Sequence, residues 1–228
     1  MKQYIASFQT LTKFERGLWF ISMAVSILSF FLSGGADYFN LIASLIGVTA
    51  LIFVAKGHVL GQLLTVLFAI FYGIISFFFR YYGEMITYLF MTAPMAIISA
   101  ITWIKNPYQD SDEVKVSIVT KKQISTMSIL TIIVTILFYF ILKLCNTTNL
   151  FFSTISITTS FIASYLTYLR SPYYAIGYSA NDIILIILWT LASIEDISYL
   201  PMVACFLMFL ANDLYGFYNW SKMQQRQE

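Results

Sequence analysis

The feature that most constrains this chain is a series of eight apolar stretches, each about as long as a bilayer is thick when helical. Cutting the sequence at its charged residues leaves candidate spans at 17–33, 38–55, 59–79, 85–104, 123–142, 149–169, 173–194 and 199–220. A helix needs about 20 apolar residues to cross the hydrocarbon core. A helix also satisfies its own backbone hydrogen bonds, as lipid requires. The sequence therefore predicts an all-α polytopic membrane protein with about eight transmembrane helices.

Composition points to the same environment. The chain is 59% hydrophobic and only 11% charged, whereas an ordinary soluble domain is about 25% charged. A soluble protein could not cover so much apolar surface, so we expect the lipid bilayer to be the principal partner. The 13 Lys and Arg residues lie between the apolar stretches and form no basic stripe, which argues against a nucleic-acid partner.

The positive residues also predict how the chain is oriented. With the N-terminus in the cytoplasm, eleven Lys and Arg residues fall in cytoplasmic segments and two, Arg80 and Lys143, fall outside. Positive residues favour the cytoplasmic side, so we expect a multi-pass protein with both termini cytoplasmic. The first span resembles a signal peptide, but its apolar part is long and carries Trp19 and Phe20. We favour a retained helix, with cleavage to seven helices as the alternative.

A weak internal repeat divides the chain. An offset of 117 residues pairs 81–105 with 198–222 and matches Tyr82 with Tyr199 and Trp103 with Trp220. Spans two to four and six to eight would both begin outside and end inside, as parallel repeats do in some transporters. We therefore expect an optional first helix and a core of three, one and three helices. The predicted division is 1–37 (tail and first helix), 38–104 (first repeat), 105–148 (polar cytoplasmic loop and linking helix), 149–222 (second repeat) and 223–228 (cytoplasmic tail).

Polar side chains inside spans are costly in lipid and are therefore candidates for function. Several of them recur at helical spacing, so that each of three spans has one polar and aromatic face. Trp103 lies at the end of the fourth span. The predicted substrate-binding residues are Gln62, Tyr72, Trp103, Tyr178, Asn181, Asp182, Trp189, Asn212, Tyr215 and Asn219.

Such faces suit a ligand with a flat ring and several hydroxyl or amide groups. Trp and Tyr rings stack on a ring and hold a cationic one more strongly, while Asn and Gln both donate and accept hydrogen bonds. The structural alternative is that the Asn residues join helices and that Trp103 and Trp220 anchor span ends at the interface. Asp182 and Asp213 lie within spans and need partners: Asn neighbours, a loop Lys or Arg, each other in protonated form, or a cationic substrate.

The remaining reactive residues indicate no enzyme, metal site or cofactor. Cys145 and Cys205 lie in or beside apolar stretches without the spacing of a disulfide framework. His58 is the single histidine, which excludes a site with several His ligands. The acidic cluster at 110–113 is interpreted as part of a hydrophilic connection, so no catalytic residue is predicted.

Several stretches of the sequence resemble a known family. The stretch from Val48 to Leu89, the following APM and WIKN segments, and NDIILIILW with PMVACFLMFLANDLYGFYNW are similar to the PnuC family of bacterial vitamin transporters. The resemblance covers about residues 38–222. It implies a fold like that of the SWEET sugar transporters, with two three-helix repeats and a linking helix. It also implies a homo-oligomer, with a trimer as the typical state, in the bacterial inner membrane.

The resemblance further implies uptake of nicotinamide riboside by facilitated diffusion, with trapping inside the cell by phosphorylation. The sequence departs from many riboside carriers after Pro94–Met95, where Ala96 stands in place of Gln and Ser99–Ala100 in place of a Gly-Trp pair. Close relatives carry deoxynucleosides, thiamine or riboflavin, and these substrates remain alternatives. Proton-coupled transport through Asp182 and Asp213 also remains open, because a carboxylate in a low dielectric can load a proton.

Overall fold

Eight long apolar helices account for most of the part of the chain that the structure describes. The computed structural model describes residues 8–34, 38–78, 82–147 and 149–228. Each long helix passes the length and composition needed to cross a membrane, which confirms the predicted fold class. The elements are α2 (Lys13–Leu32), α3 (Tyr38–Ala55), α4 (Val59–Phe78), α5 (Tyr82–Thr87) continuing through a π-helical turn η1 (Tyr88–Thr92) into α6 (Ala93–Ile104), α7 (Lys121–Leu144), α8 (Leu150–Tyr168), α9 (Tyr174–Glu195), the short 3₁₀ turn η2 (Ile197–Tyr199) and α10 (Leu200–Gln227).

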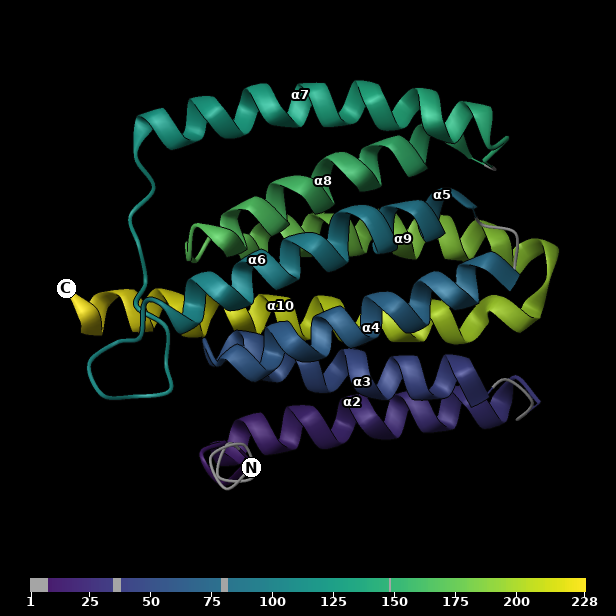
Figure 1. Ribbon diagram of the computed structural model, residues 1–228. Coiled ribbons are helices and arrows are strands. Elements are labelled where there is room, and N and C mark those ends of the chain that lie inside the picture. The colour runs from purple at the N-terminus through teal and green to yellow at the C-terminus, as the bar shows by residue number, and fades with distance from the viewer. Residues whose placement is uncertain (1–7, 35–37, 79–81, 148) are drawn as a thin grey trace.

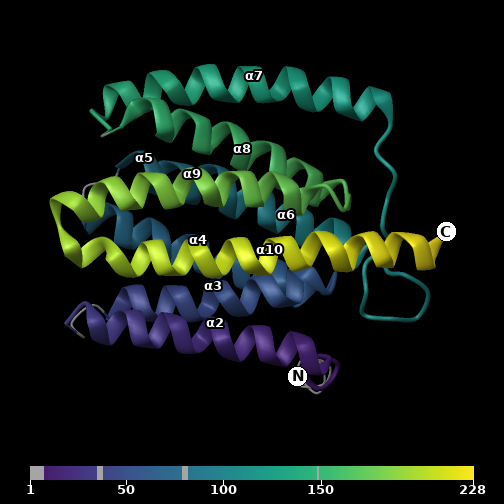
Figure 2. The same cartoon turned by 180° about the vertical axis from the view of Figure 1, so that it is seen from behind.

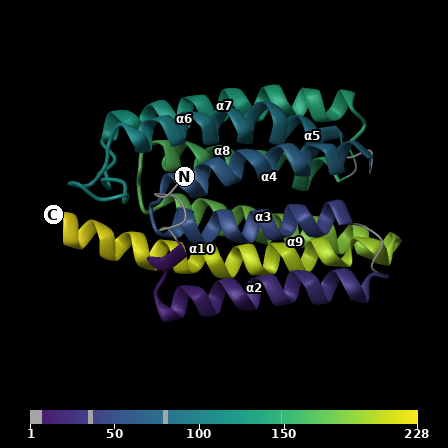
Figure 3. The same ribbon diagram turned by 60° about the horizontal axis from the view of Figure 1, so that its bottom comes forward.

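The helices run side by side in one bundle, and the beginning of α2 and the end of α10 lie at the same end of it (Figure 1). We call this end of the bundle the terminal end. The connection between α6 and α7 lies there as well, as the view from behind also shows (Figure 2). The helix α2 flanks the bundle at one edge, against α3 and α10. The helix α7 flanks the opposite edge and packs mainly on α8 (Figure 3).

The contacts between the central helices follow a crossed pattern. Within residues 38–104, α4 packs against both α3 and α6, and within 149–222, α9 packs against both α8 and α10. Between these segments, α3 packs on α10 and α6 packs on α8. The first helix of each segment thus contacts the last helix of the other, as two repeats around a twofold axis would. The division into repeats at the stated boundaries remains a prediction.

The fourth predicted span contains an irregularity that the sequence pattern does not show. It begins at Tyr82 and contains the π-helical turn η1, which ends just before Pro94 in the first turn of α6. Proline lacks a backbone N–H and its ring clashes with the carbonyl four residues earlier. A π-helical turn relieves this conflict, and such turns are frequent at functional sites. Here it carries Tyr88 and Thr92, both of which line the cavity described below.

Polar side chains fix α2 to the bundle. Its N-terminus has a capping box, in which Thr12 and Glu15 satisfy each other's backbone N–H groups. Glu15 is only 1% exposed, and its carboxylate also pairs with Lys56 at 3.2 Å. Farther along, the Trp19 indole donates to the Thr49 hydroxyl at 3.1 Å. These contacts integrate the first span into the fold.

The polar connection at 105–120 is held against the end of α10. The carboxylate of Glu113 accepts from the Arg226 guanidinium and, at 2.7 Å, from the Gln227 side chain. Gln227 also accepts from the backbone N–H of Val116 at 2.7 Å. The sequence places the end of the last span at residue 220, but α10 continues to Gln227. Lys, Met, Gln and Arg all favour helix in this stretch, and the added turns bind the connection.

Candidate functional site

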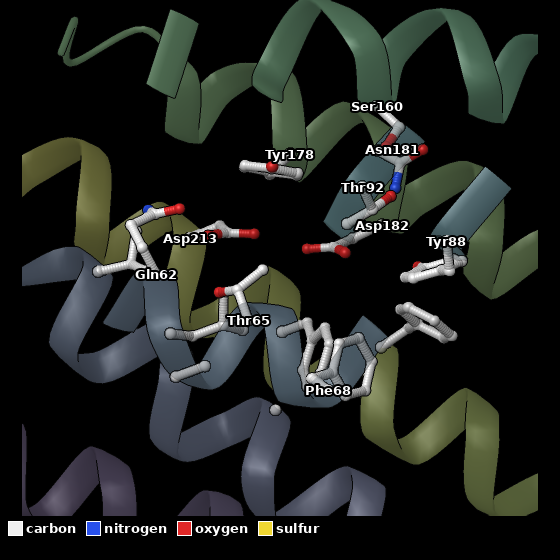
Figure 4. Close-up of a pocket in the computed structure, with 16 residues that line it drawn as sticks. Gln62, Thr65, Phe68, Tyr88, Thr92, Ser160, Tyr178, Asn181, Asp182 and Asp213 are labelled. Atoms are coloured by element: carbon white, nitrogen blue, oxygen red, sulfur yellow. The ribbon is translucent and has the colours of Figure 1, made fainter. Parts of the chain in front are cut away.

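A narrow cavity lies inside the bundle between its two central segments. Its volume is about 60 Å³, and α3, α4, η1, α8, α9 and α10 all contribute to its wall. Figure 4 shows polar and aromatic side chains directed into one space from opposite sides. The polar and aromatic lining residues are Gln62, Thr65, Phe68, Tyr88, Thr92, Ser160, Tyr178, Asn181, Asp182, Phe206, Phe209 and Asp213.

Four of the ten predicted substrate-binding residues line this cavity, namely Gln62 on α4 and Tyr178, Asn181 and Asp182 on α9. The three residues of α9 are spaced at i, i+3 and i+4, which places them on one side of a helix. Gln62 lies one turn into α4. Substrate contact by these four side chains remains a prediction.

Neighbouring helices fix the orientation of the α9 side chains. The carbonyl oxygen of Asn181 accepts hydrogen bonds from Ser156 at 3.1 Å and from Thr159 at 3.0 Å, both on α8. With its oxygen held in this way, Asn181 directs its amide nitrogen into the cavity (Figure 4). The Tyr178 hydroxyl is 3.0 Å from the hydroxyl of Ser164. Serine and threonine side chains on α8 therefore position the polar wall.

Two carboxyl groups face each other across the cavity. Asp182 from α9 and Asp213 from α10 are each 3% exposed, and Figure 4 shows them directed toward one another. Each carboxyl group influences the other electrostatically. The Oδ2 atom of Asp182 has no hydrogen-bond partner. Asp213 was not among the ten predicted binding residues, although its charge within a span was the signal that could have placed it there.

The other polar residues of α10 lie on a different side of this helix. The Asn212 amide donates to Ser22 at 3.0 Å, and the Tyr215 hydroxyl donates to Glu15 at 2.8 Å, both on α2. The Asn219 amide donates to the backbone carbonyl of Ala55 at 2.8 Å. None of these three predicted residues is part of the cavity wall, and in the structure they join helices, as polar groups in lipid often do.

The two remaining predicted residues of the central helices, Tyr72 and Trp189, form an aromatic contact beyond the cavity. The Trp189 indole donates to the Tyr72 hydroxyl at 3.1 Å, and the Tyr72 and Tyr88 rings are 4.3 Å apart. We call Tyr72, Tyr88, Trp189 and Phe206 the distal cluster, because they lie on the side of the cavity away from the terminal end. Tyr72 and Trp189 are separated by 117 residues, which is the predicted repeat offset.

A second aromatic contact lies between the cavity and the terminal end. The Trp103 and Trp220 rings are 5.3 Å apart and the Tyr174 ring is 4.9 Å from that of Trp220. Both indoles donate to backbone carbonyls, of Thr167 at 3.1 Å and of Val54 at 2.8 Å. We call Trp103, Tyr174 and Trp220 the proximal cluster. The cavity therefore lies between two aromatic clusters, and the predicted Trp103 is placed in one of them rather than on the wall.

Most of the sequence matches one family model. The model describes the nicotinamide mononucleotide transporter family and matches residues 37–222. The chain belongs to this family. The match begins after α2 and covers all of the helices that line the cavity. The chain is therefore a multi-pass membrane transporter, and the family is not one of enzymes.

Two curated relatives of the family extend over most of the chain. The nicotinamide riboside transporter PnuC of Neisseria mucosa is 24% identical over 190 residues, covering 81% of this chain and 72% of the relative. The protein of the same name from Haemophilus influenzae is 25% identical over 193 residues, covering 83% and 82%. The crystal structure of the vitamin B3 transporter PnuC has the same fold, with a TM-score of 0.82 at 22% identity over 96% of this chain and 94% of that chain.

Proposed function

We propose that this transporter carries nicotinamide riboside into the cell by facilitated diffusion. The supporting observation is the cavity between the two aromatic clusters, with its rings, amides and carboxylates, in a member of a family whose relatives are named for this substrate. Substrate sites of repeat-built transporters lie at such an interface between halves.

The lining supplies a partner for each part of such a substrate. Phe68, Tyr88 and Phe209 form an aromatic side of the cavity, and such faces stack on a pyridine ring. Gln62 supplies an amide that can donate hydrogen bonds to, and accept them from, ribose hydroxyls and a carboxamide. Asn181 supplies an N–H donor, because its oxygen already accepts from Ser156 and Thr159. The polar and aromatic groups of the wall therefore match the two chemical halves of a riboside.

The cavity in this structure is too small for a riboside. Its volume of about 60 Å³ holds a few water molecules, each needing roughly 10–15 Å³, whereas pockets for small molecules begin at about 300 Å³. Transport therefore requires the helices to separate. The proximal and distal clusters would open alternately, so that the cavity faces one side of the membrane at a time.

The direction of uptake depends on the orientation of the chain. Ten Lys and Arg residues in the described part of the chain lie at the terminal end and in the neighbouring turns, which supports cytoplasmic termini in the bacterial inner membrane. The proximal cluster is then the cytoplasmic closure. Because facilitated diffusion cannot concentrate a solute, a cytoplasmic kinase would trap the riboside as its phosphate. We further propose a homo-oligomer, with a trimer as the state that the family resemblance implies.

The test is counterflow in vesicles that contain the purified protein and no other component. Labelled nicotinamide riboside should accumulate in vesicles preloaded with the unlabelled compound and not in protein-free vesicles. Thiamine, riboflavin and deoxynucleosides are offered in parallel as competitors. Counterflow with one of these and none with nicotinamide riboside would assign the alternative substrate.

The paired carboxylates favour a second candidate, which is proton-coupled uptake through Asp182 and Asp213. An imposed pH gradient should then drive accumulation of the riboside in vesicles that were not preloaded. Asp182→Asn should abolish this effect while the protein stays folded. Uptake that does not respond to the gradient would exclude coupling and leave facilitated diffusion.

A further inference from the structure

Among the residues that the structure describes, the cavity wall contains two buried carboxyl groups and no basic side chain to pair with them. Among its lining residues in the described part of the chain there is no Lys, Arg or His. Asp182 and Asp213 are each 3% exposed, so water does little to screen them. Removing two carboxylates from water without a cationic partner is strongly unfavourable. A proton shared by the pair, or a positively charged ligand between the two groups, would offset this cost.

The position of Asp182 points to a ligand rather than to helix packing. Its Oδ2 atom has no hydrogen-bond partner, although its neighbour Asn181 is held by two hydroxyl groups. The Asp182 side chain is directed into the open space between α9 and α10 (Figure 4). A carboxylate that only joined helices would be expected to use both oxygens on the protein, as Glu15 does.

The aromatic side of the cavity fits a cation equally well. The Phe68 ring lies 5.4 Å from that of Phe209 and 5.9 Å from that of Tyr88. Aromatic faces attract a positive charge within about 6 Å, and more strongly when water is excluded. A flat ring with a delocalised charge could stack on these faces while the carboxylates lie close to it.

A third buried carboxyl group lies beyond the cavity wall, near the distal cluster. Glu84 on α5 is 4% exposed, and its Oε2 atom has no hydrogen-bond partner. It acts electrostatically on Tyr72 and Tyr88 of the distal cluster. A cation that enters from that side would therefore meet a buried carboxylate before it reaches Asp182 and Asp213.

We infer that Asp182 and Asp213 form a charge-selective site, which admits substrates with a permanently cationic aromatic ring, such as an N-glycosylated pyridinium, and rejects neutral analogues of the same shape. This inference rests on the proposed function and specifies the substrate class of the same cavity. Nicotinamide riboside has such a ring. Its 1,4-dihydro form has the same ribose and carboxamide but a neutral ring, which makes it a matched probe.

The experiment measures binding and counterflow of the two forms with the purified full-length transporter. The cationic form should bind on the order of tenfold or more tightly than the dihydro form, since tenfold corresponds to about 1.4 kcal/mol. Asp182→Asn and Asp213→Asn keep the side-chain shape and should each reduce this ratio toward one. Asp110→Asn changes an exposed aspartate of the polar connection and should leave the ratio unchanged.

Each outcome decides between the two proposals. Equal affinity of the wild-type protein for both forms, or a preference that both cavity variants retain, would overturn charge selectivity while leaving riboside transport in place. Binding of neither form by the folded wild-type protein would refute the proposed function, and the charge selectivity that rests on it. Melting temperature and gel filtration establish that each variant is folded. If one aspartate variant does not fold, the other decides the result.

Discussion

Replacing Trp220 by Phe tests whether the proximal cluster closes the cavity toward the terminal end. The Trp220 side chain is fully buried, at 0% exposed, and donates to the Val54 carbonyl at 2.8 Å. Phe lacks the donor, which costs about 1 kcal/mol. Phe is also smaller than Trp, and the space left in the cluster costs roughly another 1 kcal/mol.

Suppose that the proximal cluster is intact only while the cavity is closed toward the terminal end. Trp220→Phe then destabilises this closed state alone. A difference of about 2 kcal/mol then shifts the equilibrium roughly thirtyfold toward the state open at the terminal end. If Trp220 is only a packing residue, every state loses the same energy. The populations then stay the same and only the overall stability falls.

The assay is the rate at which a thiol in the cavity reacts with a membrane-impermeant reagent. Thr65→Cys places this thiol on the cavity wall, in a background without Cys145 and Cys205. Trp220→Phe should accelerate labelling from the terminal end by on the order of tenfold or more, and slow it from the opposite side. Trp19→Phe removes an indole hydrogen bond between α2 and α3 and serves as the control. Equal rates in both variants would refute the role of the proximal cluster as a closure.

Three further predictions follow from contacts around the cavity. Glu15→Gln weakens a buried network that includes a 3.2 Å ion pair with Lys56 and should lower stability by about 2–3 kcal/mol. Denaturant titration in detergent measures this loss, and an unchanged midpoint would contradict the structural role of α2. Gly47→Ala places a Cβ in collision with the Phe209 ring and should press this ring into the cavity, slowing counterflow several-fold at a cost of about 1–3 kcal/mol. Unchanged counterflow would contradict this position of the ring. Burial and the charge of Lys56 lower the pKa of His58 despite the opposing carboxylate of Asp112. Since the unfolded chain then binds the proton more readily than the folded one, stability should fall as pH falls through about 6.5. His58→Gln should remove this dependence in melts between about pH 5.5 and 7.5. An identical pH profile in both proteins would exclude His58 as the source of the dependence.

The helix count was predictable from sequence because lipid requires long uninterrupted helices. The spacing of Tyr178, Asn181 and Asp182 also placed one side of α9 on the cavity wall. On α10 the same reasoning selected Asn212, Tyr215 and Asn219, which contact α2 and α3 instead. Periodicity identifies a polar side of a helix but not the neighbour that this side meets.

The signal that could have separated the two sides of α10 lies on the first span. Glu15 and Ser22 are seven residues apart on one face of α2, and both are buried against α10. A span with its own polar face needs a polar partner in lipid, and α10 offers two such faces. The face with Asp213 is then left for the cavity. The π-helical turn that brings Tyr88 to the wall depends on how Pro94 is accommodated, and no apolar pattern reports this.

The central claim is that the cavity between the two aromatic clusters is the substrate site. The most direct measurement is an experimental structure of the transporter with nicotinamide riboside bound. We expect density for the pyridinium ring against Phe68 and Tyr88 with Asp182 beside it, and a cavity wider than the present one of about 60 Å³. Density for the riboside outside the bundle, or between α2 and α10 with this cavity unchanged, would contradict the account.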